Sequence, residues 1–149
     1  MKFIGIDPGF SGAWGMITHN GKYNSCGDMH HTDKHIQTRM VIAEIRQAMD
    51  GDDAQFVLEA VHAMPGQGVS STFKFGVAYG GAIAIAEHFK NPFSFISPRE
   101  WKKDMGLNSD KDNSIMLAKE LFPEAPLYLK KHNGRAEALL LAEWLRRNQ

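Results

Sequence analysis

Short apolar runs separated by polar turns predict five β-strands along the chain. They are expected at 2–7, 13–18, 22–27, 55–60 and 93–96. The turn His19-Asn20-Gly21 lies between the second run and the third, and Asn-Gly in that position is typical of a β-hairpin. The second and third strands are therefore expected to pair with each other.

Apolar residues at helical spacing predict helices between and after these strands. In the first helix, Ile36, Val41 and Ile45 fall near one face. The helices are expected at 33–49, 71–89, 110–121 and 134–147, with a further helical turn from Pro98 to Trp101. The candidate N-caps are Ser70 or Ser71 for the second helix and Ser109 or Asp110 for the third. The order of elements predicts an α/β fold, in which a hairpin-built sheet is followed by parallel crossovers.

Length and composition favour one globular domain over residues 1–149, with 43% hydrophobic and 23% charged residues. No apolar run reaches the roughly 18 residues that span a bilayer, and Asp7 interrupts the N-terminal run, so we expect no membrane contact and a soluble, intracellular protein. The single cysteine, Cys26, excludes an internal disulfide and a multi-cysteine zinc site. Because the net charge is zero, any nucleic-acid site must be a local concentration of basic residues.

Acidic residues close two of the predicted strands. Asp7 ends the first run and Glu59 ends the fourth, where an unpaired buried charge is costly. If these strands are adjacent and parallel, both carboxylates emerge at one sheet edge, where ligands bind in open α/β sheets. Glu137 lies in an apolar stripe of the last helix with Leu141 and Trp144. Three such carboxylates suit two Mg²⁺ ions, which prefer oxygen ligands and can act together on a phosphodiester.

Each of these acids also has a simpler interpretation. In this interpretation Asp7, which precedes Pro-Gly, is only a turn residue. The same interpretation applies to Glu59 at the end of its strand. Glu137 can complement the dipole at the start of its helix. The three acids together are more informative than any one of them.

Five segments, in order along nearly the whole chain, resemble the motifs of the RuvC-like Holliday-junction resolvases. The resemblance is to the small phage, bacterial and plant-organelle branch of that family. The segments are Ile4-Gly5-Ile6-Asp7-Pro8-Gly9 with Ser11-Gly12-Ala13, Val57-Leu58-Glu59, Phe73-Lys74-Phe75-Gly76 through Gly80-Gly81, Pro98-Arg99-Glu100-Trp101-Lys102, and Lys130 through Leu140. The resemblance implies a ribonuclease H-like fold, with a mixed five-stranded sheet flanked by helices, forming a single RuvC-like nuclease domain.

The same resemblance implies the activity. A family member is a homodimer that binds four-way junctions and nicks them symmetrically with Mg²⁺ or Mn²⁺, two ions per active site. It is expected in the cytoplasm or at the nucleoid, and in the host cytoplasm if a phage encodes it. Asp7, Glu59 and Glu137 match the metal-binding, catalytic acids.

One position departs from the family pattern. Asn133 stands where the family generally has an acid, often in His-Asp-Gly-Arg-Ala, either naturally or as a substitution that removes the charge. Asn133 is the expected fourth ligand, His132 is a substitute for it, and Asn133 is also a good N-cap for the last helix. Because Asn133 carries no charge, the resemblance does not by itself imply full nuclease activity.

Basic residues near these motifs are candidates for DNA contact. They form two clusters, Arg99 with Lys102 and Lys103, and Lys130 with Lys131 and Arg135. Such residues bind phosphates, although any single one of them is more simply interpreted as solvated surface. In the resemblance the loop at 64–69 reaches the crossover, which adds Gln67, Lys74 and Phe75, the last of them alternatively a core or dimer residue. The glycines and alanine of helix 71–89 permit close approach of a second helix or of the sheet.

Two other functions remain open from the sequence. A non-catalytic module that binds junctions is consistent with the neutral Asn133. A phosphotransferase of the actin-like superfamily also begins with an Asp-x-Gly turn, but it encloses ATP between two such domains. Three histidines, His30, His31 and His35, resemble a metal cluster but are interpreted as a solvated loop because they lack cysteine partners and regular spacing.

Overall fold

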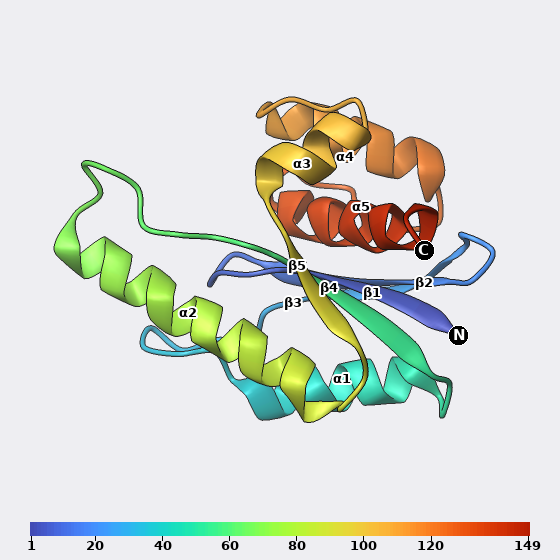
Figure 1. The fold of residues 1–149 in the computed structure, drawn as a ribbon, viewed down its shortest axis with the longest axis horizontal. Coiled ribbons are helices and arrows are strands. Elements are labelled where there is room, and N and C mark those ends of the chain that lie inside the picture. The colour runs from blue at the N-terminus through green and yellow to red at the C-terminus, as the bar shows by residue number, and fades with distance from the viewer.

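A five-stranded mixed sheet forms the centre of the molecule (Figure 1). We describe all residues, 1–149, from a computed structural model. The strands are β1 (Lys2–Asp7), β2 (Ala13–Thr18), β3 (Tyr23–Asp28), β4 (Ala54–Glu59) and β5 (Phe93–Ile96). Their order in the sheet is β3-β2-β1-β4-β5. The first three strands pair antiparallel, whereas β4 pairs parallel with β1 and with β5. The expected hairpin and parallel crossovers are confirmed.

Helices cover both faces of this sheet, as Figure 1 shows. One face carries α1 (Thr38–Met49) and α2 (Val69–His88), and the other carries α3 (Pro98–Asp104), α4 (Lys111–Leu121) and α5 (Asn133–Arg147). A turn of 3-10 helix at Lys130–His132 leads into α5. Two apolar cores result. Phe56 is buried between the sheet and α1 and α2, and Trp101 is buried on the opposite side.

The start of α1 differs from the prediction. The helix begins at Thr38 rather than at residue 33, because the preceding segment folds back on itself. His31 pairs with Ile36 in an isolated bridge, and the Thr32 hydroxyl accepts the backbone N–H groups of Lys34 and His35. Threonine competes with helical hydrogen bonding in this way when a local turn is available.

The three histidines near this turn contact different protein groups. His30 Nε2 lies 2.6 Å from a carboxylate oxygen of Glu44. His31 Nδ1 pairs with the carbonyl of Thr32, and His35 Nδ1 with the Thr32 hydroxyl. The histidines therefore do not face a common point.

Helix capping follows the prediction at α4 but not at α2. The side chain of Asp110 accepts the N–H of Asp112 and caps α4. At α2 the cap position is Gly68, with no side-chain hydrogen bond, so the prediction of Ser70 or Ser71 as N-cap is wrong. Both serines lie inside the first turn of α2, where they line the cleft described below.

Two glycines set the height of α5 above the sheet. A Cβ on Gly5 of β1 would overlap the carbonyl oxygen of Ala138, and one on Gly15 of β2 would lie 2.6 Å from the backbone nitrogen of Leu139. Only a residue without a side chain permits this approach. The close packing holds the first turns of α5 over the carboxyl end of β1.

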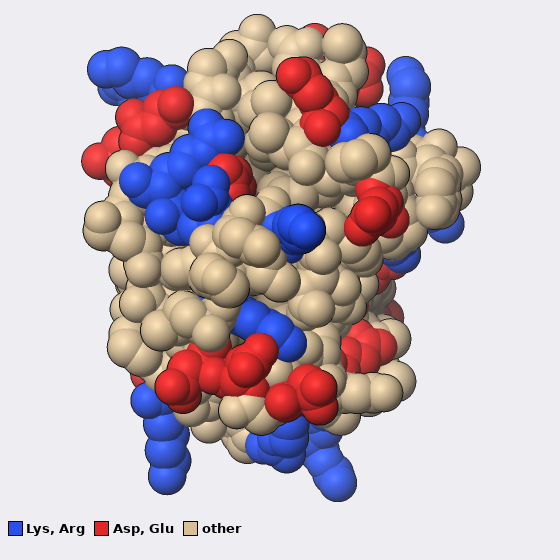
Figure 2. Space-filling model, turned by 90° about the vertical axis from the view of Figure 1, so that its right-hand side faces the viewer, with Lys and Arg blue, Asp and Glu red and all other residues tan.

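Charges of both signs alternate over the surface on the side where the two termini lie (Figure 2). That face presents no large field of one sign, in keeping with the zero net charge. None of the helices combines the length and the apolar character that crossing a membrane requires. The location in the cytoplasm or nucleoid stays a prediction.

Candidate active site

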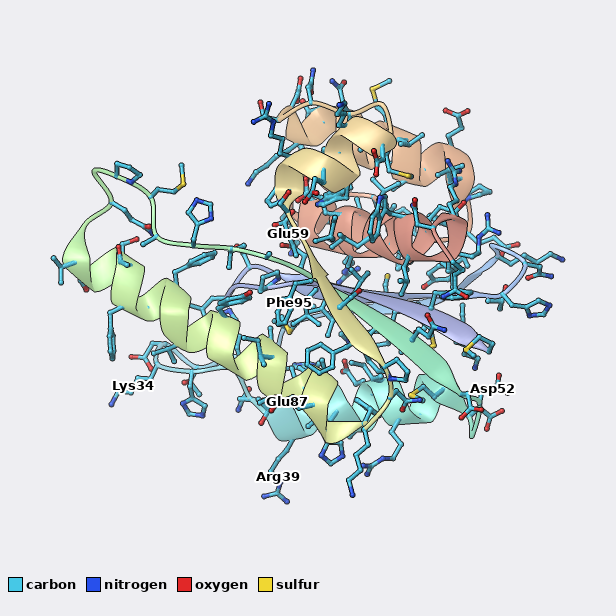
Figure 3. The ribbon with its side chains drawn as sticks, in the orientation of Figure 1. Lys34, Arg39, Asp52, Glu59, Glu87 and Phe95 are labelled. Carbon is cyan, nitrogen blue, oxygen red and sulfur yellow. The ribbon has the colours of Figure 1, made fainter.

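The two strand-terminal acids emerge side by side. Strand β1 runs parallel to β4 with Ile6 opposite Leu58, so Asp7 and Glu59 follow at the same edge of the sheet. Figure 3 shows Glu59 at this edge, below the ends of α3 and α5. Glu137 comes from α5 above and is 6% exposed. These acids and Asn133 line one cleft of about 800 Å³, so the structure brings all four predicted ligands together.

A tight turn after β1 holds Asp7 in place. Gly9 has a φ of 130°, which side chains rarely adopt, and the N–H of Gly12 donates to the Gly9 carbonyl. The first turn of α5 packs against this loop. A Cβ on Gly134 would lie 2.8 Å from the carbonyl oxygen of Ser11 and 3.4 Å from Oδ2 of Asp7. The start of α5 is therefore fitted to the turn that carries Asp7.

The other two acids accept hydrogen bonds from the helices above them. The indole Nε1–H of Trp101 donates to Glu59 Oε1 at 2.8 Å. Glu137 Oε1 accepts from Lys102 Nζ at 2.8 Å and from Ser114 Oγ at 3.2 Å. Lys102, predicted as a DNA contact, is instead paired with an acid of the cleft.

Burial and repulsion from neighbouring charges act against ionisation of Asp7 and Glu59. Burial raises the pKa of Asp7 well above its usual range, and the charges of Glu59 and Glu137 raise it further, against opposing effects of Lys102 and Lys111. Burial also raises the pKa of Glu59, which the Trp101 hydrogen bond partly offsets. A cation in the cleft would favour the ionised forms of both acids.

Asn133 does not act as a helix cap. It is the first residue of α5, and the preceding position is His132, which makes no side-chain cap. The Asn133 amide Nδ2 is buried without a hydrogen-bond partner. The interpretation of Asn133 as N-cap is therefore wrong, and its amide lines the cleft with a polar group still unsatisfied.

His132 has a structural role outside the cleft. Its side chain is buried, and its Nδ1 accepts the backbone N–H of Leu129. It does not line the cleft. The structure gives no support to His132 as a substitute ligand.

The donor set suits a hard divalent cation. Three carboxylates and the amide oxygen of Asn133 supply oxygen ligands, which Mg²⁺ and Mn²⁺ prefer. The unpaired Nδ2 of Asn133 is a donor and marks a place for an acceptor, such as a phosphate or water oxygen. The site is not a preformed cage, since no three acidic, histidine or cysteine side chains converge closely enough to hold one ion. Glu137 is turned toward Lys102 and Ser114 instead.

Three predicted DNA contacts line the same cleft, namely Gln67, Lys74 and Phe75. Lys74 Nζ lies 5.9 Å from the ring centroid of Phe10, within the range of a cation–π contact. The ring of Phe75 lies near Gly9 of the Asp7 turn. These residues form the wall of the cleft on the side of α2.

The remaining basic candidates differ in their availability. Arg99 and Lys103 are exposed on α3, and Lys130 and Lys131 are exposed before α5. Arg135 instead donates to both Asp28 carboxylate oxygens, at 2.7 and 2.8 Å, and to the Pro126 carbonyl. With its guanidinium committed to these partners, Arg135 is a structural residue here, contrary to the prediction.

Sequence reasoning missed several residues of the site, including Trp101, Lys111 and Ser114. Ser114 is fully buried on the apolar face that α4 forms with Ile115 and Ala118. A lone hydroxyl on such a face is a signal that could have been recognised, because buried polar groups are hydrogen-bonded. Lys111 gives no comparable signal, since it precedes that face in an exposed first turn.

The fold and this cleft define an α/β domain of the ribonuclease H-like type with an acidic site at the carboxyl ends of its strands. Two solved structures of Thermus thermophilus RuvC share the fold, one of them in complex with a Holliday junction substrate. Their TM-scores are 0.68 for the complex and 0.69 for the other, each at 16% identity over 99% of this chain and 96% of RuvC. No family model matches the chain.

A sequence relative links the chain to a resolvase more directly. The chloroplastic Holliday junction resolvase MOC1 of Chlamydomonas reinhardtii is 50% identical over 91 residues, which cover 58% of this chain. The chain spans about a tenth (10%) of the length of that relative. The resemblance to the RuvC-like resolvases and the ribonuclease H-like fold that it implied are thereby confirmed.

Proposed function

We propose that residues 1–149 form one nuclease domain that resolves four-way DNA junctions by symmetric, metal-dependent nicking. The observation that supports this most strongly is the convergence of Asp7, Glu59 and Glu137 in one cleft at the carboxyl ends of β1 and β4. The RuvC fold and the 50% identity to a Holliday junction resolvase add to it.

The three acids and the Asn133 amide oxygen are the proposed ligands of one or two Mg²⁺ or Mn²⁺ ions. Bound ions of this kind polarise a phosphodiester and lower the pKa of water, which supplies the chemistry of hydrolysis. The chain itself holds the ligands in place, through the Gly9 turn at Asp7 and the Trp101 hydrogen bond at Glu59.

DNA contacts are proposed on both sides of the cleft. Lys74 and Lys111 line it directly. Arg99, Lys103, Lys130 and Lys131 are exposed beyond it and can bind phosphates, although Lys130 also lies 4.0 Å from the Asp112 carboxylate. Because a four-way junction has two-fold symmetry, we propose an isologous homodimer that presents two such clefts to it.

The decisive test is a nicking assay with four-way junction and linear duplex DNA, with Mg²⁺, with Mn²⁺ and with chelator. Paired nicks in the junction alone, only with metal, are expected. Asp7→Asn should abolish nicking, a loss of at least about 100-fold, since it removes a charged ligand at constant shape, and should leave junction binding nearly unchanged.

Two other outcomes would contradict the proposal. Junction binding without nicking under any metal condition would identify a non-catalytic binding module. The neutral Asn133 is consistent with that alternative. Loss of both binding and nicking in Asp7→Asn, accompanied by a lower melting temperature, would show that Asp7 serves folding.

A further inference from the structure

A lysine already occupies part of the acidic cluster. Lys102 Nζ lies 2.8 Å from Glu137 Oε1, and the side chains are only 17% and 8% exposed. A pair so far removed from water is screened much less by salt than a surface pair. Glu137 is thus neutralised by the chain itself when no metal is bound.

Further contacts fix the two partners of this ion pair in place. Ser114 Oγ donates to the same Glu137 oxygen. Lys102 Nζ also lies 5.2 Å from the ring centroid of Trp101, which donates its own N–H to Glu59. Two successive residues of α3 therefore contact two of the three acids. The charge of Lys102 acts on the third acid as well, where it opposes the rise in the pKa of Asp7.

Lys102 also borders a second hollow next to the cleft. This hollow of about 550 Å³ lies between α3 and the start of α4, and the lysine shares it with Arg99 and Lys103. A phosphate bound among these three basic groups would offer Lys102 an alternative partner to Glu137. The side chain thus stands between an acidic site and a basic one.

We propose that Lys102 is a built-in counter-cation of the metal site, which a second divalent ion must displace from Glu137. The three carboxylates, the neutral Asn133 and the paired Lys102 leave two net negative charges, before the cleft-lining Lys74 and Lys111 are counted, so they balance at most one divalent ion. The second ion therefore binds only when Lys102 leaves, and phosphate in the neighbouring hollow favours its departure. This inference rests on the proposed metal-dependent function, and it predicts that bound DNA promotes full metal loading.

The first test uses the unaltered protein. Lysines are acetylated with a water-soluble N-hydroxysuccinimide ester at increasing Mg²⁺, and each site is quantified by mass spectrometry, while thermal shift reports Mg²⁺ binding. Acetylation of Lys102 should rise several-fold as Mg²⁺ saturates, and that of the exposed neighbour Lys103 should stay constant. Constant or falling acetylation of Lys102 while Mg²⁺ binds would overturn the inference.

The second test measures metal affinity without DNA. Free Mn²⁺ is followed by its electron paramagnetic resonance signal in wild type, Lys102→Met, Lys103→Met and Ser114→Ala. Lys102→Met should bind its weaker Mn²⁺ about tenfold more tightly, equivalent to about 1.4 kcal/mol, and the Lys103 variant should match wild type. Ser114→Ala removes a hydrogen bond but no charge, so its effect should be smaller. Weaker Mn²⁺ binding by Lys102→Met would mean that the lysine instead orients Glu137 for the ion.

These outcomes separate the inference from the proposed function. If neither wild type nor Lys102→Met binds Mn²⁺ or Mg²⁺, the metal-dependent function fails and the inference fails with it. If metal binds but Lys102 acetylation and affinity do not respond, only the inference fails. Should Lys102→Met not fold without metal, the acetylation of the wild-type protein decides the question alone.

Discussion

At the scale of single residues, the site depends on which polar groups have partners. Glu59 and Glu137 each accept a hydrogen bond from α3, whereas the buried Nδ2 of Asn133 has none. An unsatisfied buried donor costs about 1–3 kcal/mol. Asn133 therefore contributes neither a charge nor a satisfied hydrogen bond to the metal-free protein.

Replacing Asn133 with an acid tests this position. Asn133→Asp adds a fourth negative charge at the same side-chain length, and a charge pair at about 4 Å is worth about 4 kcal/mol at an effective dielectric constant of ~20, before desolvation. We expect faster nicking of junction DNA and at least a roughly tenfold lower Mg²⁺ requirement. The melting temperature without metal should fall, because four buried carboxylates then repel one another.

The comparison requires nicking rates over a range of Mg²⁺ concentrations, with Asn133→Ala as the matched variant that lacks any ligand oxygen. Equal rates for wild type and Asn133→Asp would show that the amide oxygen of Asn133 already suffices as a metal ligand. If Asn133→Ala also matched them, Asn133 would have no part in metal binding.

At the scale of elements, α5 joins the site to the core. Its start is fitted to the Asp7 turn through Gly134, and its middle lies on the sheet at Gly5 and Gly15. Its last turns are held by Glu143, which is 3% exposed and is paired with Arg146 and Arg147 at 2.7 and 2.6 Å. Loosening of this helix would therefore displace Glu137 and Asn133.

Glu143 makes the stability of the protein depend on pH through α5. Burial alone would raise the pKa of Glu143, but hydrogen bonds from Arg146 and Arg147 outweigh it, and the pKa lies below its usual value of 4.5. A lowered folded-state pKa stabilises the protein above the unfolded pKa, and this contribution is lost as pH falls through the folded value. Glu143→Gln should cost about 1–3 kcal/mol at pH 7.

Urea unfolding of wild type and Glu143→Gln from neutral pH to below the folded pKa of Glu143 measures this effect. The difference between their free energies of unfolding should shrink once the pH falls below 4.5. Glu120→Gln, an exposed acid on α4, is the control and should show little difference throughout. A Glu143 difference that persists unchanged in acid would mean that packing, rather than charge, is lost.

Local sequence patterns predicted the elements of this fold well, because strand-length apolar runs and helical spacing are local signals. The sequence pattern predicts too early a start for α1, because the Thr32 turn lies within an apparently continuous helical pattern. Local patterns do not predict contacts between residues that are distant in sequence. Nothing near Arg135 indicates its pairing with Asp28, and nothing near Lys102 indicates that it turns toward Glu137.

At the scale of the whole molecule, one surface of α2 lacks a partner. Val69, Phe73, Gly76 and Gly80 recur at helical spacing, and the two large side chains are 89% and 73% exposed. A Cβ on either glycine would meet nothing within 4 Å. An apolar stripe with small residues permits a second helix to approach closely, which suits an isologous contact between two copies.

We therefore expect this stripe to form the homodimer interface. Phe73→Glu places a charge where the two copies meet near their two-fold axis, and an unpaired charge in an apolar contact is costly. Light scattering at micromolar concentration should show a dimer for wild type and a monomer for Phe73→Glu. The control is Tyr128→Glu, which alters a residue of similar exposure, 77%, in the loop before α5 and should leave the dimer intact.

If the dimer places two clefts on one junction, Phe73→Glu should also convert paired nicks into single, uncoupled ones in a supercoiled cruciform plasmid. Wild type that stays monomeric with and without junction DNA would rule this interface out, and a Phe73→Glu dimer would move it elsewhere on the molecule.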